Sequence, residues 1–444
     1  MAEAAHVYDP SSQIFIVSTA ILIVTYGLVV TERINRAVAA LLGAGLVVIT
    51  GILNQEEAVK AIDFNTLGLL AGMMMVVGVS KKSGLFGYVA VRAVQAVRGS
   101  PAGALAILTL VTAVFSALLD NVTTVLLIVP VTFVVCGQLK LPIYPFLFTE
   151  ILASNIGGTS TLVGDPPNIL IGSAAGLTFT DFVLNVGPIV VAILFGQMIL
   201  NHVLWGFWMR ASREQRDHVM ALDAKEMITD PWLLKCSVFV IAAVTVAFIL
   251  AHTLHLEPAT IALFGAAVLL ALESIPHPNH KHAELVTHSF HEVEWITLFF
   301  FIGLFVVIGG VEHAGLLQLL ADKTVSITAG DPKTTAVAIL WGSAVLSAIV
   351  DNIPFVATMI PLVKSLAPAL GGEQALPPLW WALSLGACLG GNGTLVGASA
   401  NLTVAGLAEK NGVRFSFMKF TLLAFPMMLA SVAMAHIYLL WRYY

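Results

Sequence analysis

The sequence predicts an all-α integral membrane protein with two inverted-topology repeats, each with five crossings, one re-entrant hairpin and one broken helix. The first observation is composition. The 444 residues are 58% hydrophobic and only 11% charged, whereas soluble domains contain about 25% charged residues. The second is a series of apolar runs of about 20 residues, the length that crosses about 30 Å of hydrocarbon. The third is an internal repeat of hydropathy, glycines and polar motifs.

Ten apolar segments are predicted to cross the membrane completely. The first has no basic region before it and no cleavage site after it, so we expect a retained span and not a signal peptide. Two further stretches, 102–138 and 335–363, are each interrupted by an Asp-Asn pair and are too short for two spans and too long for one. We expect re-entrant hairpins with a polar turn inside the membrane. The ten crossings are 13–30, 36–53, 66–82, 145–174, 182–209, 233–255, 257–273, 295–312, 379–409 and 417–441.

The positions of Lys and Arg predict the orientation. On this layout only five of the 21 Lys and Arg lie on one side, and the other 16, Arg33 and Arg36 among them, lie on the opposite side. The positive-inside rule places the basic side in the cytoplasm and both termini outside. We therefore expect a multi-pass protein of the plasma membrane, which is the inner membrane in a bacterium.

The internal repeat predicts how the chain divides. FSALLDNVTTVLLIVPV (115–131) aligns with LSAIVDNIPFVATMIPL (346–362) at an offset of 231, and GGTSTLVGDPPN (157–168) aligns with GGNGTLVGASAN (390–401) at an offset of 233. We predict a first repeat at 1–209, a cytoplasmic linker at 210–232 and a second repeat at 233–444. An odd number of crossings per repeat inverts one repeat relative to the other, which points to a substrate site at their interface near the midplane.

The hairpin tips are the first candidate site for a small substrate or ion. A turn inside the bilayer exposes backbone groups that Asn and Thr side chains, or a ligand, can satisfy. The alternative is that Asp and Asn only cap the second hairpin helix, because both are favoured N-caps. Burying a carboxylate at both tips is costly, which favours a functional role. The candidates at the tips are Asp120, Asn121, Thr123, Thr124, Asp351 and Asn352.

The broken helices are the second candidate site. A double glycine flanked by small polar residues does not favour a continuous helix. Unwinding would free N–H groups that attract anions and carbonyls that attract cations. The alternative is a close helix-packing patch of small residues. The candidates here are Asn155, Gly158, Thr159, Asn168, Asn392, Thr394 and Asn401, together with Cys388, which aligns with Asn155.

The predicted spans contain acids at membrane depth and no comparable Lys or Arg. Intramembrane acids commonly bind protons or cations. Glu150 and Asp165 have no acidic mates in the second repeat, so we predict that these two couple transport to protons, whereas Asp120 and Asp351 match each other. A site without fixed positive charge suits a neutral polar molecule, a cation, or an anion held by helix ends.

Other function classes lack their motifs. The chain has no GxxxxGK[ST] motif, its His291-Glu292 does not continue as HExxH, and its three cysteines are far apart. No basic block with interleaved aromatics indicates nucleic acid. We expect no enzymatic activity, no cofactor and no bound metal.

DNVTTVLLIVPVT, SNIGGTSTLVGDPPNILIGS, DNIPFVATMIP and LGACLGGNGTLVGASANLTVAGLAEKNGVRFSF together resemble the ArsB/P-protein group of the ion transporter superfamily. This group includes arsenite efflux permeases and the melanosomal P protein, and is more distantly similar to NhaD sodium/proton antiporters and divalent-anion/sodium symporters. The resemblance covers almost the whole chain. The segment GDPPN (164–168) is closer to the P protein sequence than to the sequences of arsenite permeases.

The resemblance implies a scaffold domain and a mobile transport domain that moves in an elevator-like manner. It also implies a site built from the hairpin tips and broken helices, and a soluble ATPase as a partner of some members. The leading expectation is proton-coupled efflux of arsenite or antimonite. The alternatives are a sodium/proton antiporter and a sodium-coupled anion symporter.

Overall fold

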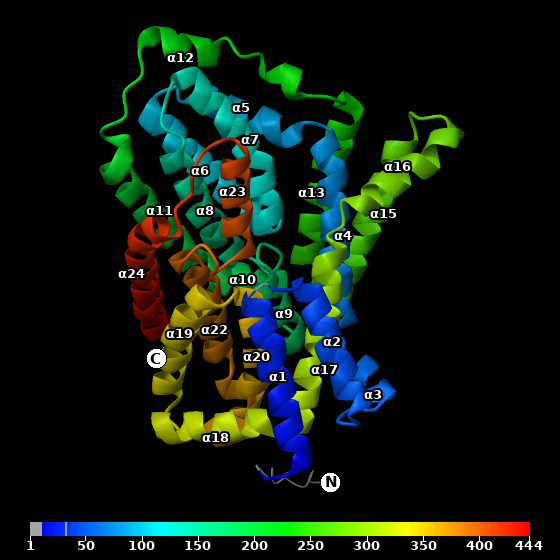
Figure 1. The fold of residues 1–444 in the computed structure, drawn as a ribbon. Coiled ribbons are helices and arrows are strands. Elements are labelled where there is room, and N and C mark those ends of the chain that lie inside the picture. Colours follow the sequence, from blue (N-terminus) through cyan, green and yellow to red (C-terminus); the bar gives the residue numbers. More distant parts are fainter. Residues whose placement is uncertain (1–10, 32) are drawn as a thin grey trace.

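The computed structural model describes residues 11–31 and 33–444, and in that part of the chain all regular structure is helical (Figure 1). The first repeat holds one helical hairpin, one broken helix and a final helix. Its main elements are α1 (Gln13–Thr31), α2 (Arg36–Ile49), α3 (Gln55–Lys60), α4 (Phe64–Lys82), α5 (Leu85–Ala96), α6 (Pro101–Leu118), α7 (Asn121–Leu139), α8 (Tyr144–Thr159), α9 (Pro166–Ala175), α10 (Phe179–Asn185) and α11 (Gly187–Asn201).

The linker forms α12 (Arg213–Met220), and the second repeat follows with the same order of elements. Its main elements are α13 (Pro231–Ile249), α15 (Pro258–Ser274), α16 (Asn279–His291), α17 (Trp295–His313), α18 (Leu316–Thr328), α19 (Pro332–Ile349), α20 (Asn352–Ser365), α22 (Pro377–Gly390), α23 (Ser399–Lys410) and α24 (Phe417–Tyr443).

The two helical hairpins enter from opposite ends of the molecule, which confirms the inverted repeats. In Figure 1 the hairpin α6–α7 extends from the end where the linker helix α12 lies, and the hairpin α19–α20 extends from the opposite end, beside α18. Their tips meet, because Asn121 at the start of α7 and Asn352 at the start of α20 line the same small cavity. The helices that follow the breaks then cross to the other repeat, because α9 packs on α20 and α23 packs on α7.

The remaining long helices interlock the repeats in a second way. Helix α4 packs on α15, and α17 packs on α2. A Cβ atom added to Gly72 would lie 2.6 Å from the backbone of Ala262, and one added to Gly303 would lie 2.5 Å from the backbone of Ala40. Both crossings therefore require glycine, and they are equivalent positions of the two repeats. Each repeat supplies the partner of the other repeat's long helix.

The crossings are partly as predicted. In the described residues, nine continuous helices are long and apolar enough to span a membrane. The predicted breaks in 145–174 and 379–409 are confirmed. The predicted full crossing 36–53 is too long, because α2 ends at Ile49 and has only 14 residues, about 21 Å at 1.5 Å per residue. The predicted crossing 257–273 matches α15 in length, but with 17 residues, about 26 Å, α15 is shorter than the nine continuous spans. Both begin near the centre of the molecule in Figure 1.

Two amphipathic helices, α5 and α18, were not expected from the sequence. Each begins at a glycine in the left-handed region, Gly84 with φ 78° and Gly315 with φ 81°. Side chains disfavour this region, and a Cβ on Gly84 would also lie 1.7 Å from the carbonyl oxygen of Met227. The glycines therefore let the chain turn sharply from α4 and α17 into helices that precede the hairpins.

Candidate functional site

The first arm of each hairpin packs closely on the broken helix of its own repeat. A Cβ on Gly157 would lie 2.2 Å from the carbonyl oxygen of Ala113, and one on Gly390 would lie 2.5 Å from that of Ala344. Equivalent serines strengthen both contacts: Ser116 Oγ donates to the Ser154 carbonyl and Ser347 Oγ to the Ala387 carbonyl, each at 2.6 Å. The first glycine of each pair therefore serves close packing.

The broken segments are closed by an asparagine from the helix that follows. Asn168 Nδ2 donates to the carbonyl oxygens of Thr159 at 3.0 Å and Thr161 at 2.9 Å. Asn401 Nδ2 does the same in the second repeat, reaching the Gly391 and Thr394 carbonyls at 2.8 Å each. These bonds satisfy carbonyls that unwinding leaves without a helical partner. They hold the breaks in one shape.

A buried asparagine network joins the two repeats behind the tips. Asn155 Nδ2 donates to Oδ1 of Asn392 and Oδ1 of Asn401, both at 2.9 Å, and Asn121 Nδ2 donates to Asn155 Oδ1 at 3.1 Å. All four residues are buried. Because every link is between side chains of different helices, the network fixes the tips and breaks relative to one another.

Asn168, the mate of Asn401, meets different partners. Its Oδ1 accepts from Ser384 Oγ at 2.7 Å and lies 3.5 Å from the Cys388 sulfur. The Cys388 side chain is fully buried there. It does not line the cavity described next.

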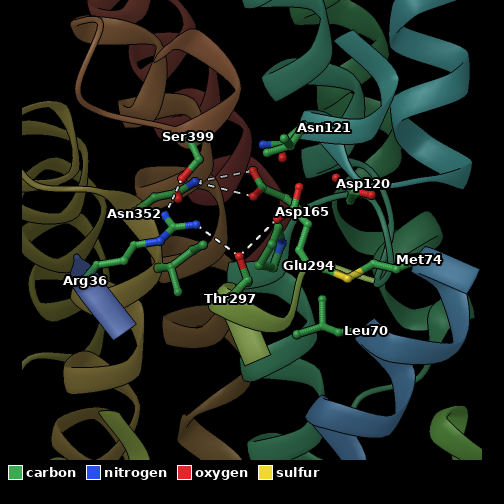
Figure 2. Close-up of a pocket in the computed structure, with 13 residues that line it drawn as sticks. Arg36, Leu70, Met74, Asp120, Asn121, Asp165, Glu294, Thr297, Asn352 and Ser399 are labelled. Carbon is green, nitrogen blue, oxygen red and sulfur yellow. Dashed lines mark hydrogen bonds between the residues drawn. The ribbon is translucent and has the colours of Figure 1, made fainter. Parts of the chain in front are cut away.

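A small cavity lies between the two tips (Figure 2). Its volume is about 20 Å³, enough for about one water-sized group. One wall is contributed by α2, α4 and α17, and the other by the hairpin tips and the first turns of α9 and α23. The lining residues are Arg36, Leu70, Met74, Asp120, Asn121, Val122, Asp165, Pro166, Glu294, Thr297, Asn352, Ile353 and Ser399.

The acids at the tips act as helix caps and also face this region. Asp120 caps α7 by accepting from the Thr123 amide at 2.8 Å and from the Thr123 hydroxyl. Asp351 caps α20 by accepting from the Ile353 amide at 3.0 Å, and its other oxygen accepts from Ser399 Oγ at 2.8 Å. Both acids therefore do cap the second helix of their hairpin, as the alternative interpretation proposed. Capping does not exclude a functional role, because Asp120 also lines the cavity.

Asp165 lines the cavity opposite the second tip. Its two carboxylate oxygens lie 3.4 and 3.5 Å from Asn352 Nδ2 (Figure 2). These are long contacts, so an ion or a water can compete for the same oxygens. Asp165 and Asn352 come from different repeats, so the site exists only at their interface.

Arg36 is a cavity residue, and the expectation of no basic residue at this depth was wrong. Its guanidinium donates to Ser399 Oγ at 2.9 Å and to Thr297 Oγ1 at 3.0 Å. Thr297 Oγ1 in turn donates to Glu294 Oε2 at 3.0 Å. The prediction failed because α2 is a short helix that begins inside the molecule, whereas the charge count assumed a full span beginning at the surface. Glu294 was also missed as a site residue.

Glu150 lies apart from the cavity, between α7 and α8. It is fully buried, and its Oε1 accepts from Thr132 Oγ1 at 2.5 Å. Its other oxygen has no hydrogen-bond partner among the described residues, and neither does the buried hydroxyl of Thr124. The two acids predicted for proton coupling therefore lie in different surroundings, with only Asp165 lining the cavity.

Comparison with known proteins identifies the family. The family profile described as citrate transporter (CitMHS) matches residues 26–386. The chain belongs to this family. It is 42% identical over 434 residues to an uncharacterized transporter of Mycobacterium tuberculosis, covering 97% of this chain and 99% of the relative. It is 35% identical over 507 residues to the human P protein, covering 96% of this chain and 59% of the relative.

The fold is shared with a solved transporter. The crystal structure of the YdaH transporter of Alcanivorax borkumensis, described as having an unusual topology, superposes with a TM-score of 0.60 at 14% identity and covers 86% of each chain. Family membership and the nine apolar helices found in residues 11–31 and 33–444 establish a multi-pass membrane transporter. The similarity to the human P protein confirms the resemblance to the P-protein group.

Proposed function

We propose that this member of the citrate transporter family is a secondary active transporter that couples a small anionic solute to a cation, proton or sodium, with the cation held in the cavity between the hairpin tips. One observation carries the proposal. A single guanidinium, that of Arg36, faces three cavity acids, Asp120, Asp165 and Glu294, with Asp351 beside it.

The excess of acids supports a bound cation. Four ionised carboxylates and one guanidinium sum to three negative charges, and uncompensated buried charge is costly. Protons or a small cation would offset that charge. Carboxylate and amide oxygens are suitable ligands for a hard cation, and the cavity of about 20 Å³ has room for a group of that size.

The guanidinium supports an anionic cargo. Arginine presents a planar set of donors that matches a carboxylate. In the present arrangement the donors of Arg36 are used by Ser399 and Thr297. A cargo carboxylate could take their place when the cavity opens, and the family to which the chain belongs is named for citrate.

Two further candidates remain, and both use the same cavity. Sodium/proton antiport would need only the acids. Proton-coupled efflux of arsenite or antimonite, the leading expectation from sequence, would use Asn121, Asn352 and Ser399 to bind a neutral hydroxylated metalloid. Arg36 and Cys388 make the metalloid less favoured, because a guanidinium lines the cavity and the buried thiol does not.

The arrangement also supports an elevator-like motion. Helices α2, α4 and α17 form one cavity wall, while the hairpin tips with α9 and α23 form the other. Displacement of the second group against the first would carry the cavity between the two sides.

The test is transport by the purified full chain in proteoliposomes, with a pH gradient and a sodium gradient imposed separately. Radiolabelled citrate, arsenite and sodium are measured in parallel, with protein-free liposomes as the blank. We expect citrate flux that requires one of the gradients. Sodium flux driven by the pH gradient without any anion would favour the antiporter. Arsenite flux alone would favour the efflux permease.

A further inference from the structure

Two acid–threonine pairs occupy equivalent places in the two repeats. Glu294 precedes α17 and accepts from Thr297 Oγ1 at 3.0 Å. Asp63 precedes α4 and accepts from Thr66 Oγ1 at 2.6 Å. Both members of one pair are 231 residues from those of the other. Only the Glu294–Thr297 pair lines the cavity of Figure 2.

Asp63 lines a second and larger cavity, of about 330 Å³, between the start of α4 and helices α9, α17 and α20. Its charged lining residues are Asp63, Glu312 and Lys364. In Figure 1 helices α3 and α20 lie toward the end of the molecule opposite the linker helix α12. Helix α20 therefore lines both cavities: its first turn faces the small cavity, and its later turns face the larger one.

Inverted repeats supply a second conformation of the same chain. When each repeat takes the conformation that the other now has, the molecule opens toward the opposite side without new kinds of contact. In that exchanged conformation, the pair that lines the cavity between the hairpin tips is the one on α4. The pair on α17 takes the place that Asp63 and Thr66 have now.

We propose that Asp63 is the counterpart of Glu294 and lines the transport site when it opens on the side opposite the linker. This inference rests on the proposed function and extends it to the second access state. Asp63 shares its present cavity with Pro361, and Glu294 shares its cavity with Asn352. The first α20 residue that lines the Asp63 cavity, Ala357, lies five residues after Asn352, so the hairpin slides by about 7 Å or more along its axis at 1.5 Å per residue.

The geometry is tested by cross-linking in native membranes. The pair Asp63→Cys with Ala357→Cys lines one cavity now and is expected to link through a short bifunctional thiol reagent. The pair Asp63→Cys with Ile353→Cys is expected to link only in the exchanged conformation, because Ile353 lines the other cavity now. The parent chain serves as blank, since its three cysteines are buried. Peptide mass spectrometry identifies each link.

The first pair also reports that the double-cysteine chain is folded. If it links and the Asp63–Ile353 pair never does under any imposed gradient, the inference is wrong. If both link but the wild type moves no solute, the exchange stands and the proposed function fails.

A functional measurement separates the two acids. Asp63→Asn should raise the half-saturating cargo or coupling-ion concentration about tenfold when it is supplied on the side opposite the linker, and Glu294→Gln should do so on the linker side, as expected for a lost charged contact. Glu56→Gln is the matched control, because Glu56 is exposed on α3 and forms a surface ion pair with Lys60. Equal effects of Asp63→Asn on both sides, or none on either, would overturn the assignment.

Discussion

Arg36 Nη1 lies 3.8 Å from Asp351 Oδ2, so a residue at the start of α2 faces the tip of the second repeat's hairpin. Both side chains are partly exposed, and the guanidinium also lies 5.6 Å from the Phe300 ring centroid. The contact joins one wall of the cavity to the other. It must break if the two walls slide past each other.

Replacing Arg36 should weaken binding of the anionic cargo and leave binding of the coupling cation intact. We expect Arg36→Gln to reduce citrate flux by at least about tenfold, the value of one charge-assisted contact, while sodium or proton binding persists. The control is Arg33→Gln, an exposed residue of the same connection. Anion affinity and ion-induced fluorescence changes are measured separately. Unchanged anion affinity in Arg36→Gln would mean that this side chain only bridges the walls.

The capping and functional roles of Asp120 can be separated. Asn caps a helix about as well as Asp, so Asp120→Asn should keep thermal stability and abolish most transport. Asp331→Asn is a matched control. Asp331 caps α19 with the same pattern, accepting from the Thr334 amide at 2.8 Å and its hydroxyl at 2.6 Å, on an exposed surface. Normal transport by Asp120→Asn at every pH would leave this carboxylate as a cap alone.

Asn155 should matter for stability as well as for transport. Asn155→Ala removes the donor for two buried acceptors, Asn392 Oδ1 and Asn401 Oδ1, which should cost about 1–3 kcal/mol or more. Thermal unfolding in detergent is the measurement. Asn411→Ala is the control, because Asn411 Nδ2 donates to the Leu407 carbonyl at an exposed helix end. Equal midpoints for the two variants would show that the network adds no stability.

The inverted repeats predict from which side of the membrane introduced cysteines can be labelled. Helices α5 and α12 lie at one end of the molecule and α18 at the other (Figure 1). Cysteines at the exposed positions Ala96 and Met220 should label from the same side, which the positive-inside rule makes cytoplasmic. A cysteine at Ser326 should label from the other side. Labelling of Ala96 and Met220 from opposite sides would contradict the assignment.

Sequence reasoning predicted the repeat and the breaks because their signals are local. The Asp-Asn pairs and double glycines mark positions where a membrane helix cannot continue without compensation. The length of α2 was not predictable in this way. The stretch 36–53 is apolar enough for a span, but the helix ends at Ile49. The close contacts of Gly72 with α15 and of Gly303 with α2 were not predictable either, because they join the two repeats.

The site was predicted in part. The tip and break residues do converge, but the sequence could not separate those that line the cavity, such as Asp165, from those that hold the frame, such as Asn155 and Asn401. That distinction depends on which oxygens are already bonded. Arg36 and Glu294 were missed because each follows a loop that a hydropathy profile places at the membrane surface.

Proton coupling should depend differently on Asp165 and Glu150. Asp165 lines the cavity and shares its oxygens with Asn352, so Asp165→Asn should weaken both ion binding and the response to a pH gradient. Glu150 lies outside the cavity, bonded to Thr132. Glu150→Gln keeps the shape and a hydrogen-bonding group there, so cargo affinity should change little while gradient-driven flux falls.

The measurement is cargo affinity beside flux at a series of imposed pH gradients for each variant. Glu409→Gln is the matched control, since Glu409 is an exposed acid at the end of α23. A carboxyl that carries the proton must exchange it during each cycle, and an amide cannot. Flux in Glu150→Gln should therefore no longer depend on the pH gradient, while it still saturates with increasing cargo concentration. If Glu150→Gln and Asp165→Asn both retain full proton-driven flux, the proton is carried by Asp120 or Glu294, the other acids lining the cavity.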